Sequence, residues 1–235
     1  MPDNLFIPSV DMRIGALEEY NRRQKAKAEK YIPREDKPRP CITLSREFGC
    51  EAYPAAEKLC ELMRQKTGEE WLLMDKALLD ELARRNNLSR EILENLGDQN
   101  RFLNEFLATF SSRWASHEDY FRSLSRYILS LAETGNVVIV GRGGAVVTSH
   151  LENCHHFKIF ASMKFKVASI ARRTAIAPEE AEKLIISKQA QRDRFNREFL
   201  DLHKHDNSFY DMLFNNDHMS AVMIAETIAD YMVKQ

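Results

Sequence analysis

Cys41–Leu59, CITLSREFGCEAYPAAEKL, is the stretch that decides the fold of this chain. Ile42–Leu44 is a short apolar run that fits a buried strand, and Pro54–Met63 carries apolar residues at helical spacing. A proline in the first turn is compatible with a helix that begins there. The stretch therefore predicts a strand, a tight turn over Ser45–Pro54 and an amphipathic helix. The unpaired amides at the start of such a helix favour an anion, so the turn is a candidate phosphate site.

The rest of the chain continues the alternation of strands and helices. Further strands are predicted over the apolar runs Trp71–Met74, Val137–Val140, Phe157–Ala161 and Tyr210–Phe214, and a last helix over Ser220–Val233. The continuous β-branched run at Val137–Val140 is typical of a parallel strand that is covered on both faces. Helical crossovers between successive strands require a parallel sheet with helices on both sides. The sequence therefore predicts an α/β fold with three layers (α/β/α) and a five-stranded parallel sheet.

Three segments lie outside this regular alternation. Residues 76–134 contain no strand signal and are predicted to be a helical insert, with helices over 89–97, 102–113 and 120–133. A long helical region, rich in arginine and lysine, is predicted to begin at Pro178 and to reach about His203. Residues 1–40 comprise a charged helical stretch over 17–30 and a proline-broken connector over 31–40. This appendage is expected to be a solvated helix that lies loosely on the domain or is partly disordered, and a dedicated partner-binding arm is the alternative.

Composition excludes several classes of function. The chain has 34 basic and 35 acidic side chains and a net charge of -1, so it has no general field to attract nucleic acid or a membrane surface. Its four cysteines are too widely spaced for a zinc or redox pair, and its seven histidines lack metal-ligand spacing, so no metal site is predicted. No signal peptide and no membrane-spanning run is evident. We expect a cytoplasmic protein.

Several motifs together resemble the cytidylate kinase-like branch of the P-loop nucleoside monophosphate kinases. They are ITLSREFG before a helix, WLLMDKALL at the second strand, ETGNVVIVGRGG at the third, and QRDRFNREF followed by FYDMLFNND. The resemblance covers residues 41–235 and implies a P-loop kinase-like domain. It implies that the insert (76–134) closes over an acceptor nucleotide and that an arginine-rich lid (174–205) covers the donor. The implied substrates are ATP and a nucleoside monophosphate, with Mg2+ accompanying ATP.

The resemblance assigns phosphate binding to the Ser45–Pro54 turn, through Ser45, Arg46, Gly49, Cys50, Glu51, Ala52 and Tyr53. The turn departs from the related pattern SREFGSGGRE, because Glu51 and Ala52 replace glycines and Tyr53 replaces an arginine. Pro54 offers no hydroxyl to magnesium. A desolvated carboxylate at Glu51 would repel a triphosphate. Cys50 lies at a helix N-terminus, where a thiol pKa can fall. The alternative is a plain strand-to-helix turn in which Glu51 caps the helix.

Other candidate residues lie at strand ends and on the late helices. Arg142 follows the third strand, where ligands bind in open α/β folds, and its planar guanidinium suits a phosphate. The resemblance implies acceptor binding by Asp75, Arg142 and Gly143, donor-base stacking by Arg172 and Arg173, and catalysis by Arg192, Arg194 and Arg197. The alternatives are a helix cap at Asp75, an ordinary glycine-rich loop at Arg142, and a solvated helical face for the other arginines.

Two functional hypotheses follow from these residues. In the first, the protein is a kinase-like enzyme that transfers the γ-phosphoryl group of ATP to a nucleoside monophosphate such as CMP. In the second, it is a catalytically degraded relative that binds a nucleotide or a partner protein in a regulatory role. The retained arginines favour the enzyme, and the altered turn favours the inactive relative. The enzyme is the leading hypothesis.

Overall fold

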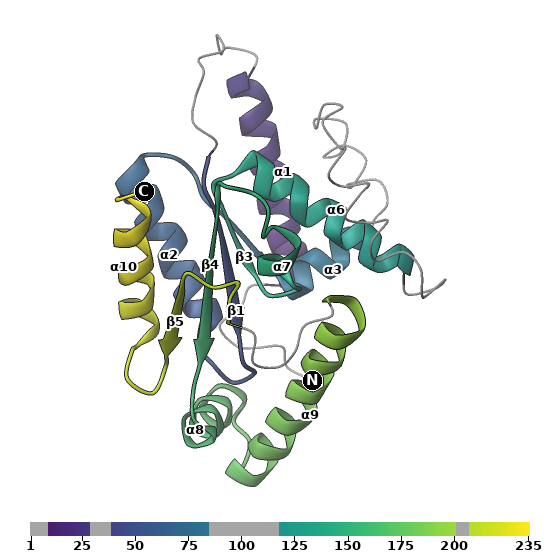
Figure 1. Ribbon diagram of the computed structural model, residues 1–235, viewed down its shortest axis with the longest axis vertical. Helices are drawn as coiled ribbons and strands as arrows, with labels where there is room; N and C mark the ends of the chain where they lie inside the picture. The colour runs from purple at the N-terminus through teal and green to yellow at the C-terminus, as the bar shows by residue number, and fades with distance from the viewer. Residues whose placement is uncertain (1–8, 29–38, 85–117, 201–206) are drawn as a thin grey trace.

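A computed structural model of the chain describes residues 9–28, 39–84, 118–200 and 207–235 (Figure 1). The predicted five-stranded parallel sheet is confirmed. Its strands are β1 (Cys41–Arg46), β2 (Leu72–Asp75), β3 (Val137–Val140), β4 (Cys154–Phe160) and β5 (Met212–Asn215), in the order β2-β3-β1-β4-β5. The central strand pairs Leu44 with Val140 on one side and with Phe157 on the other. The Ser45–Pro54 turn therefore leaves the middle of the sheet. At this position the strand order switches from one side of β1 to the other, and ligands usually bind at such a switch point.

One face of the sheet is covered by α2 (Ala52–Thr67) and α10 (Ala221–Met232), which lie side by side in Figure 1. Ile42 and Leu44 of β1 are fully buried against Leu59 of α2 and Ile228 of α10. Burial of apolar side chains on β1, α2 and α10 fixes α2 against the sheet. The start of α2 is thereby held at the carboxyl end of β1.

The other face is covered by α1 (Val10–Ala28), α3 (Lys76–Arg84), α6 (Glu118–Thr134) and the short α7 (Gly144–Val147). The expectation of a loosely attached N-terminal helix is wrong, because Ile14 and Leu17 are only 3% and 2% exposed within this core. Residues three apart share one helix face, so two apolar side chains suffice to anchor a helix whose other positions are charged. The helix also begins earlier than predicted, at Val10.

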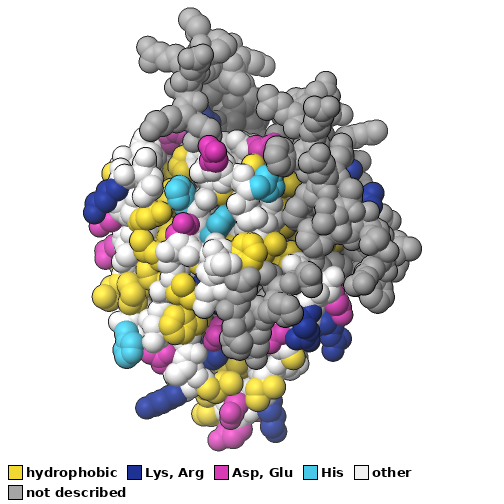
Figure 2. Space-filling view, in the orientation of Figure 1, with side chains coloured by type: hydrophobic (Ala, Val, Ile, Leu, Met, Phe, Trp, Pro, Cys, Tyr) yellow, Lys and Arg dark blue, Asp and Glu magenta, His cyan; other side chains and the backbone are white. Residues whose placement is uncertain are grey.

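Two further helices, α8 (Met163–Thr174) and α9 (Pro178–Leu200), lie at the carboxyl end of the strands (Figure 1). They pack on each other through Ile170, Ala181 and Ile185. Hydrophobic side chains gather over β5 and α10 in Figure 2, whereas basic and acidic side chains are interspersed around α8 and α9. The helices predicted over 89–97 and 102–113, and the lid beyond residue 200, fall outside the described residues. Within the described ranges, no helix is both long and apolar enough to cross a membrane.

Candidate functional site

A cleft of about 800 Å³ lies between the carboxyl ends of the strands and α9. Its walls come from Ser45–Phe48, from Gly141–Gly143 and from α9, with the exposed face of β4 and β5 as a floor. Basic side chains dominate its charged lining: Arg46, Lys76, Arg142, Lys158, Lys188, Arg192 and Arg197. We call this cavity the arginine cleft. Its charge suits an anionic ligand that carries more than one negative group.

Arg46 reaches from the end of β1 across the residue that follows β3. A methyl group at Gly141 would lie 1.6 Å from Arg46 Nη1, so the guanidinium can pass only over a glycine, which here has a φ of 82°. Burial lowers the pKa of Arg46 to about 10; nearby Asp75 opposes this shift and Arg142 adds to it. Arg46 therefore remains a cation at neutral pH, inside the cleft.

Arg142 is held from two directions. Its Nε and Nη2 donate to the two carboxylate oxygens of Asp80 at 2.7 and 2.5 Å, and its Cζ lies 4.9 Å from the centre of the Phe195 ring. Lys76 Nζ also lies 2.8 Å from Asp80. In the described part of the chain, Arg142 Nη1 has no partner, so that edge remains available to a ligand. The sequence gives no signal for Asp80 or Phe195, because nothing local links either residue to Arg142.

Arg192 lies deep in the same cleft. Its Nη1 donates to the backbone carbonyl of Arg46 at 3.1 Å, and its Cζ lies 5.1 Å from the centre of the Phe48 ring. Burial, and then the nearby charge of Arg46, lower the pKa of Arg192 well below its ordinary value. Arg197 also lines the cleft. Arg194 is exposed and does not line it, because two residues along a helix correspond to a rotation of about 200°.

The backbone amides of the Ser45–Pro54 turn divide into two groups. Phe48 N–H donates to Gln189 Oε1 at 2.8 Å, Glu51 N–H to Asn216 Oδ1 at 2.9 Å, and Cys50 N–H to the Glu47 carbonyl at 3.4 Å. The amides of Gly49, Ala52 and Tyr53 have no partner in the described ranges. Sequence reasoning missed Gln189 and Asn216 as ligands of the turn. Gly49 and Ala52 are buried, however, and none of Gly49, Ala52 and Tyr53 lines either cavity, so these amides do not form an open phosphate-binding loop.

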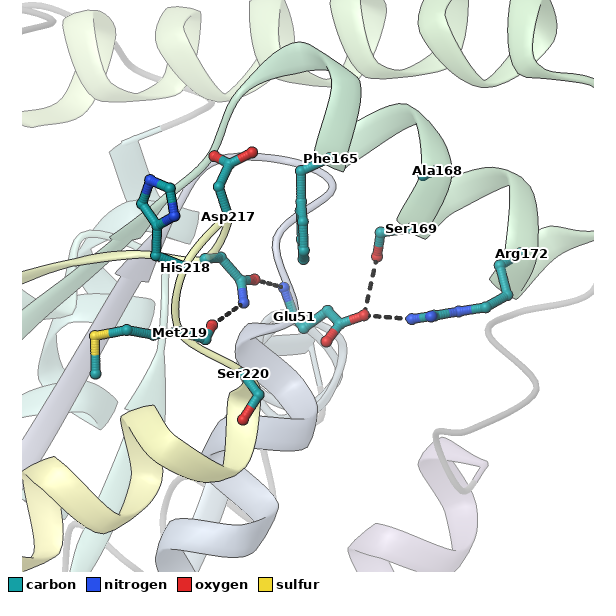
Figure 3. Close-up of a pocket in the computed structure, with 10 residues that line it drawn as sticks. Glu51, Phe165, Ala168, Ser169, Arg172, Asp217, His218, Met219 and Ser220 are labelled. Carbon is teal, nitrogen blue, oxygen red and sulfur yellow. Dashed lines mark hydrogen bonds and ion pairs between the residues drawn. The ribbon is translucent and has the colours of Figure 1, made fainter.

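The Glu51 carboxylate points toward α8 (Figure 3). Its Oε1 accepts from Ser169 Oγ at 3.4 Å and from Arg172 Nη2 at 2.5 Å, and its side chain makes no capping hydrogen bond to α2. The alternative of a capping Glu51 is therefore wrong. The sequence also makes Cys50 a possible reactive thiol with a lowered pKa, although a small turn residue is the favoured interpretation; burial in fact raises the pKa of this thiol to about 12. Burial outweighs the favourable field of a helix N-terminus here.

A second cavity of about 460 Å³ opens on the α8 side of Glu51. Phe165 and Arg172 of α8 line it, together with His218 and Met219 from the segment between β5 and α10, and Arg172 extends toward Glu51 in Figure 3. Arg172 lines this cavity and Arg173 does not. Instead, Arg173 Nη2 lies 3.5 Å from the Gly49 carbonyl, and burial lowers the pKa of its guanidinium. The structure thus separates two neighbouring arginines into one cavity residue and one support of the turn.

Asp75 ends β2 and begins α3. Its Oδ1 accepts from the Leu78 N–H at 3.0 Å, which confirms the predicted helix cap. The same oxygen lies 2.6 Å from Arg13 Nη1 of α1, an ion pair that the sequence did not indicate. Burial raises the pKa of Tyr53, and the nearby charge of Arg13 opposes this rise. Among the described residues, no group of three histidine, cysteine or acidic side chains is placed to hold a metal ion.

A five-stranded parallel sheet with a strand–turn–helix corner at its centre and a basic cleft above it is the architecture of the P-loop kinases. Residues 41–218 match the model of the cytidylate kinase-like family, and the chain belongs to that family. Its function is therefore nucleotide kinase-like in the broad sense. No curated protein that was compared matches the chain.

The chain is similar to several solved structures. An uncharacterized protein from Eubacterium ventriosum ATCC 27560 superimposes with a TM-score of 0.63 at 19% identity, covering 84% of this chain and 99% of that one. A shikimate kinase from Bacteroides thetaiotaomicron gives a TM-score of 0.40 at 14% identity, over 83% of this chain and 96% of its own. A dephospho-CoA kinase from Campylobacter jejuni gives a TM-score of 0.34 at 11% identity, over 85% of this chain and 100% of its own.

Proposed function

We propose that the protein is a phosphotransferase that moves the γ-phosphoryl group of ATP to a nucleoside monophosphate such as CMP. The observation that carries this proposal is the meeting of Arg46, Arg142, Arg192 and Arg197 in one cleft beside the Ser45–Pro54 turn. Phosphoryl transfer depends on positioning and on cations at the equatorial and bridging oxygens, and requires little covalent chemistry from the protein. A cluster of guanidinium groups, three of them half-buried and Arg197 exposed, supports such a role.

Each group has a proposed task. The free Nη1 edge of Arg142, with Gly143 beside it in the cleft, would take the acceptor phosphate. Arg46 and Arg192, with Arg197 at the rim, would surround the transferred group. The donor triphosphate would lie in the arginine cleft against Ser45 and Arg46, with the buried residues Gly49, Cys50 and Ala52 behind them and Glu51 and Tyr53 outside the cleft. The second cavity, beside Arg172, would take the donor base.

Mg2+ is the expected cofactor, since members of P-loop kinase-like families generally use Mg-ATP. Pro54 cannot supply the usual hydroxyl, but the Ser45 hydroxyl and the carboxylates of Glu47 and Asp193 line the cleft. Mg2+ commonly binds through one or two carboxylates together with phosphates and water. Glu47 already pairs with Lys166 and Asp193 accepts from Gln189, so Mg2+ would bind here in competition with these contacts. When bound, the ion would neutralise charge on the donor phosphates.

The second candidate function is that of an inactive, nucleotide-binding or partner-binding relative. It is favoured by the Glu51 carboxylate at the turn and by the loss of the Phe48 and Glu51 amides to Gln189 and Asn216. A phosphate on the turn would meet fewer amide donors and one nearby negative charge. Binding without turnover is the result that would distinguish this candidate.

The test is ADP release from Mg-ATP with CMP, dCMP, UMP, AMP and GMP, together with calorimetric binding of each nucleotide. We expect turnover with one acceptor class, and a loss of ~100-fold in kcat/KM for Arg142→Gln. Arg194→Gln is the matched control, because Arg194 is exposed on α9 and lies outside the cleft. ATP binding without turnover would support the inactive relative. If the protein shows no turnover with any acceptor and does not bind ATP, the kinase proposal is refuted.

A further inference from the structure

Arg13, from the N-terminal helix α1, extends into the edge of the site from outside the segment that matches the family. Its Nη1 lies 2.6 Å from Asp75 Oδ1, and the two side chains are only 13% and 12% exposed. The positive charge of Arg13 also acts on Tyr53, in the first turn of α2, and opposes the rise that burial causes in the Tyr53 pKa. The Nε of Arg13 is buried with no hydrogen-bond partner in the described residues. A guanidinium buried at this cost requires an explanation beyond surface charge.

The ends of three neighbouring strands bring Asp75 close to a second arginine. Asp75 of β2 lies beside Val140 of β3, and Val140 lies beside Leu44 of β1, two residues before Arg46. The Arg46 side chain crosses Gly141, directly after Val140, and so runs toward the β2 side of the sheet. The Asp75 charge acts attractively on Arg46. One carboxylate therefore has two guanidinium neighbours, and only Arg13 is in direct contact with it.

This arrangement decides which guanidinium pairs with Asp75 and which one stays open to a ligand. Asp75 is neutralised by Arg13, so Arg46 faces the cleft without a carboxylate in direct contact. Without Arg13, the buried Asp75 would draw on Arg46, since opposite charges interact strongly in a partly desolvated site. A buried ion pair such as Arg13–Asp75 adds little net stability compared with apolar packing, so stability alone does not account for it.

We propose that Arg13 is a positioning residue of the arginine cleft, which holds Asp75 and thereby leaves Arg46 available to a phosphate. The N-terminal helix is then a working part of the site. This inference rests on the proposed function in one respect, because it assigns phosphate binding to the arginine cleft. It does not require turnover, so inorganic pyrophosphate can serve as the probe.

The experiment measures calorimetric binding of pyrophosphate to the full chain and to four variants: Arg13→Gln, Asp75→Asn, the double variant, and Arg22→Gln. We expect Arg13→Gln to weaken binding ~10-fold. Asp75→Asn, which keeps a capping side chain, should bind at least as tightly as the unmodified protein. The double variant should recover to within about threefold of it. Arg22, on the same helix with a side chain 79% exposed, is the matched control and should change nothing.

Recovery in the double variant separates positioning from general structural damage, because a damaged fold would not regain affinity by losing a second residue. Thermal unfolding of each variant checks that it is folded, and Arg13→Lys should retain most of the affinity. Unchanged binding in Arg13→Gln, a double variant as weak as the single one, or no pyrophosphate binding by the unmodified protein would each overturn the inference. If the variants bind pyrophosphate as expected but the protein releases no ADP, the inference is upheld and the kinase proposal is overturned. If the protein turns over and Arg13→Gln binds pyrophosphate normally, the kinase proposal is upheld and the inference is overturned.

Discussion

Replacement of Arg192 by glutamine tests the catalytic part of the site directly. The guanidinium lies in the arginine cleft, with Nη1 3.1 Å from the Arg46 carbonyl and Cζ 5.1 Å from the Phe48 ring centre. A unit charge ~4 Å from a phosphoryl oxygen contributes about 4 kcal/mol at an effective dielectric constant of ~20. Loss of that charge in the transition state corresponds to a decrease of ~10³-fold in kcat. The expected effect on kcat is therefore between ~10²-fold and ~10³-fold.

Stability should respond much less than activity. The variant loses one hydrogen bond to a backbone carbonyl and one cation–π contact, each worth about 1 kcal/mol. It also relieves the cost of burying Arg192 near Arg46, which lowers the pKa of the Arg192 guanidinium. These opposing effects should leave the free energy of unfolding within about 1 kcal/mol of the unmodified value.

The assay is ADP release at saturating Mg-ATP and acceptor, with urea unfolding of the same preparations. Arg194→Gln is the control, because it removes an equal charge two residues away on the exposed side of α9. If the two variants turn over within about threefold of each other, Arg192 is not a catalytic cation. A loss of activity that follows the loss of stability would equally refute the reasoning.

Three further results are expected. Glu51→Gly should raise ATP affinity severalfold, because it removes a carboxylate from the turn and glycine is tolerated at a helix N-cap; unchanged affinity would mean that the turn is not a nucleotide site. Leu59→Ala should cost about 3 kcal/mol in urea unfolding, since Leu59 is fully buried, whereas Val222→Ala, at a side chain 46% exposed, should cost under about 0.5 kcal/mol. Burial lowers the pKa of His156 from 6.5 to about 4, although nearby Asp211 opposes this shift. His156 therefore binds a proton more readily in the unfolded chain than in the folded protein. Stability should therefore be full above pH 6.5 and fall toward pH 4, by about 2 kcal/mol at pH 5 relative to a His156→Gln variant, and equal pH profiles would contradict this account.

Local patterns were enough to predict the fold. The apolar runs at Ile42–Leu44 and Val137–Val140 form strands because a buried parallel strand requires a continuous apolar segment, and the helical spacing after Pro54 places α2 on the sheet. Arg142 could be placed at a strand end for the same reason. The Asp75 cap follows from a single position at the start of a helix. Each of these inferences needs only neighbours along the chain.

The tertiary structure decided which charges meet. Arg142 is held by Asp80, 62 residues away, and the Phe48 amide by Gln189, 141 residues away. Helical geometry separated Arg194 from Arg192, and Arg172 from Arg173, where the sequence grouped them by type. The two apolar side chains of α1 predicted neither that this helix packs into the core nor that Arg13 reaches Asp75. Sequence periodicity determines which residues are buried. The net charge available to a ligand depends on distances between groups far apart in the chain, and only the folded structure establishes those distances.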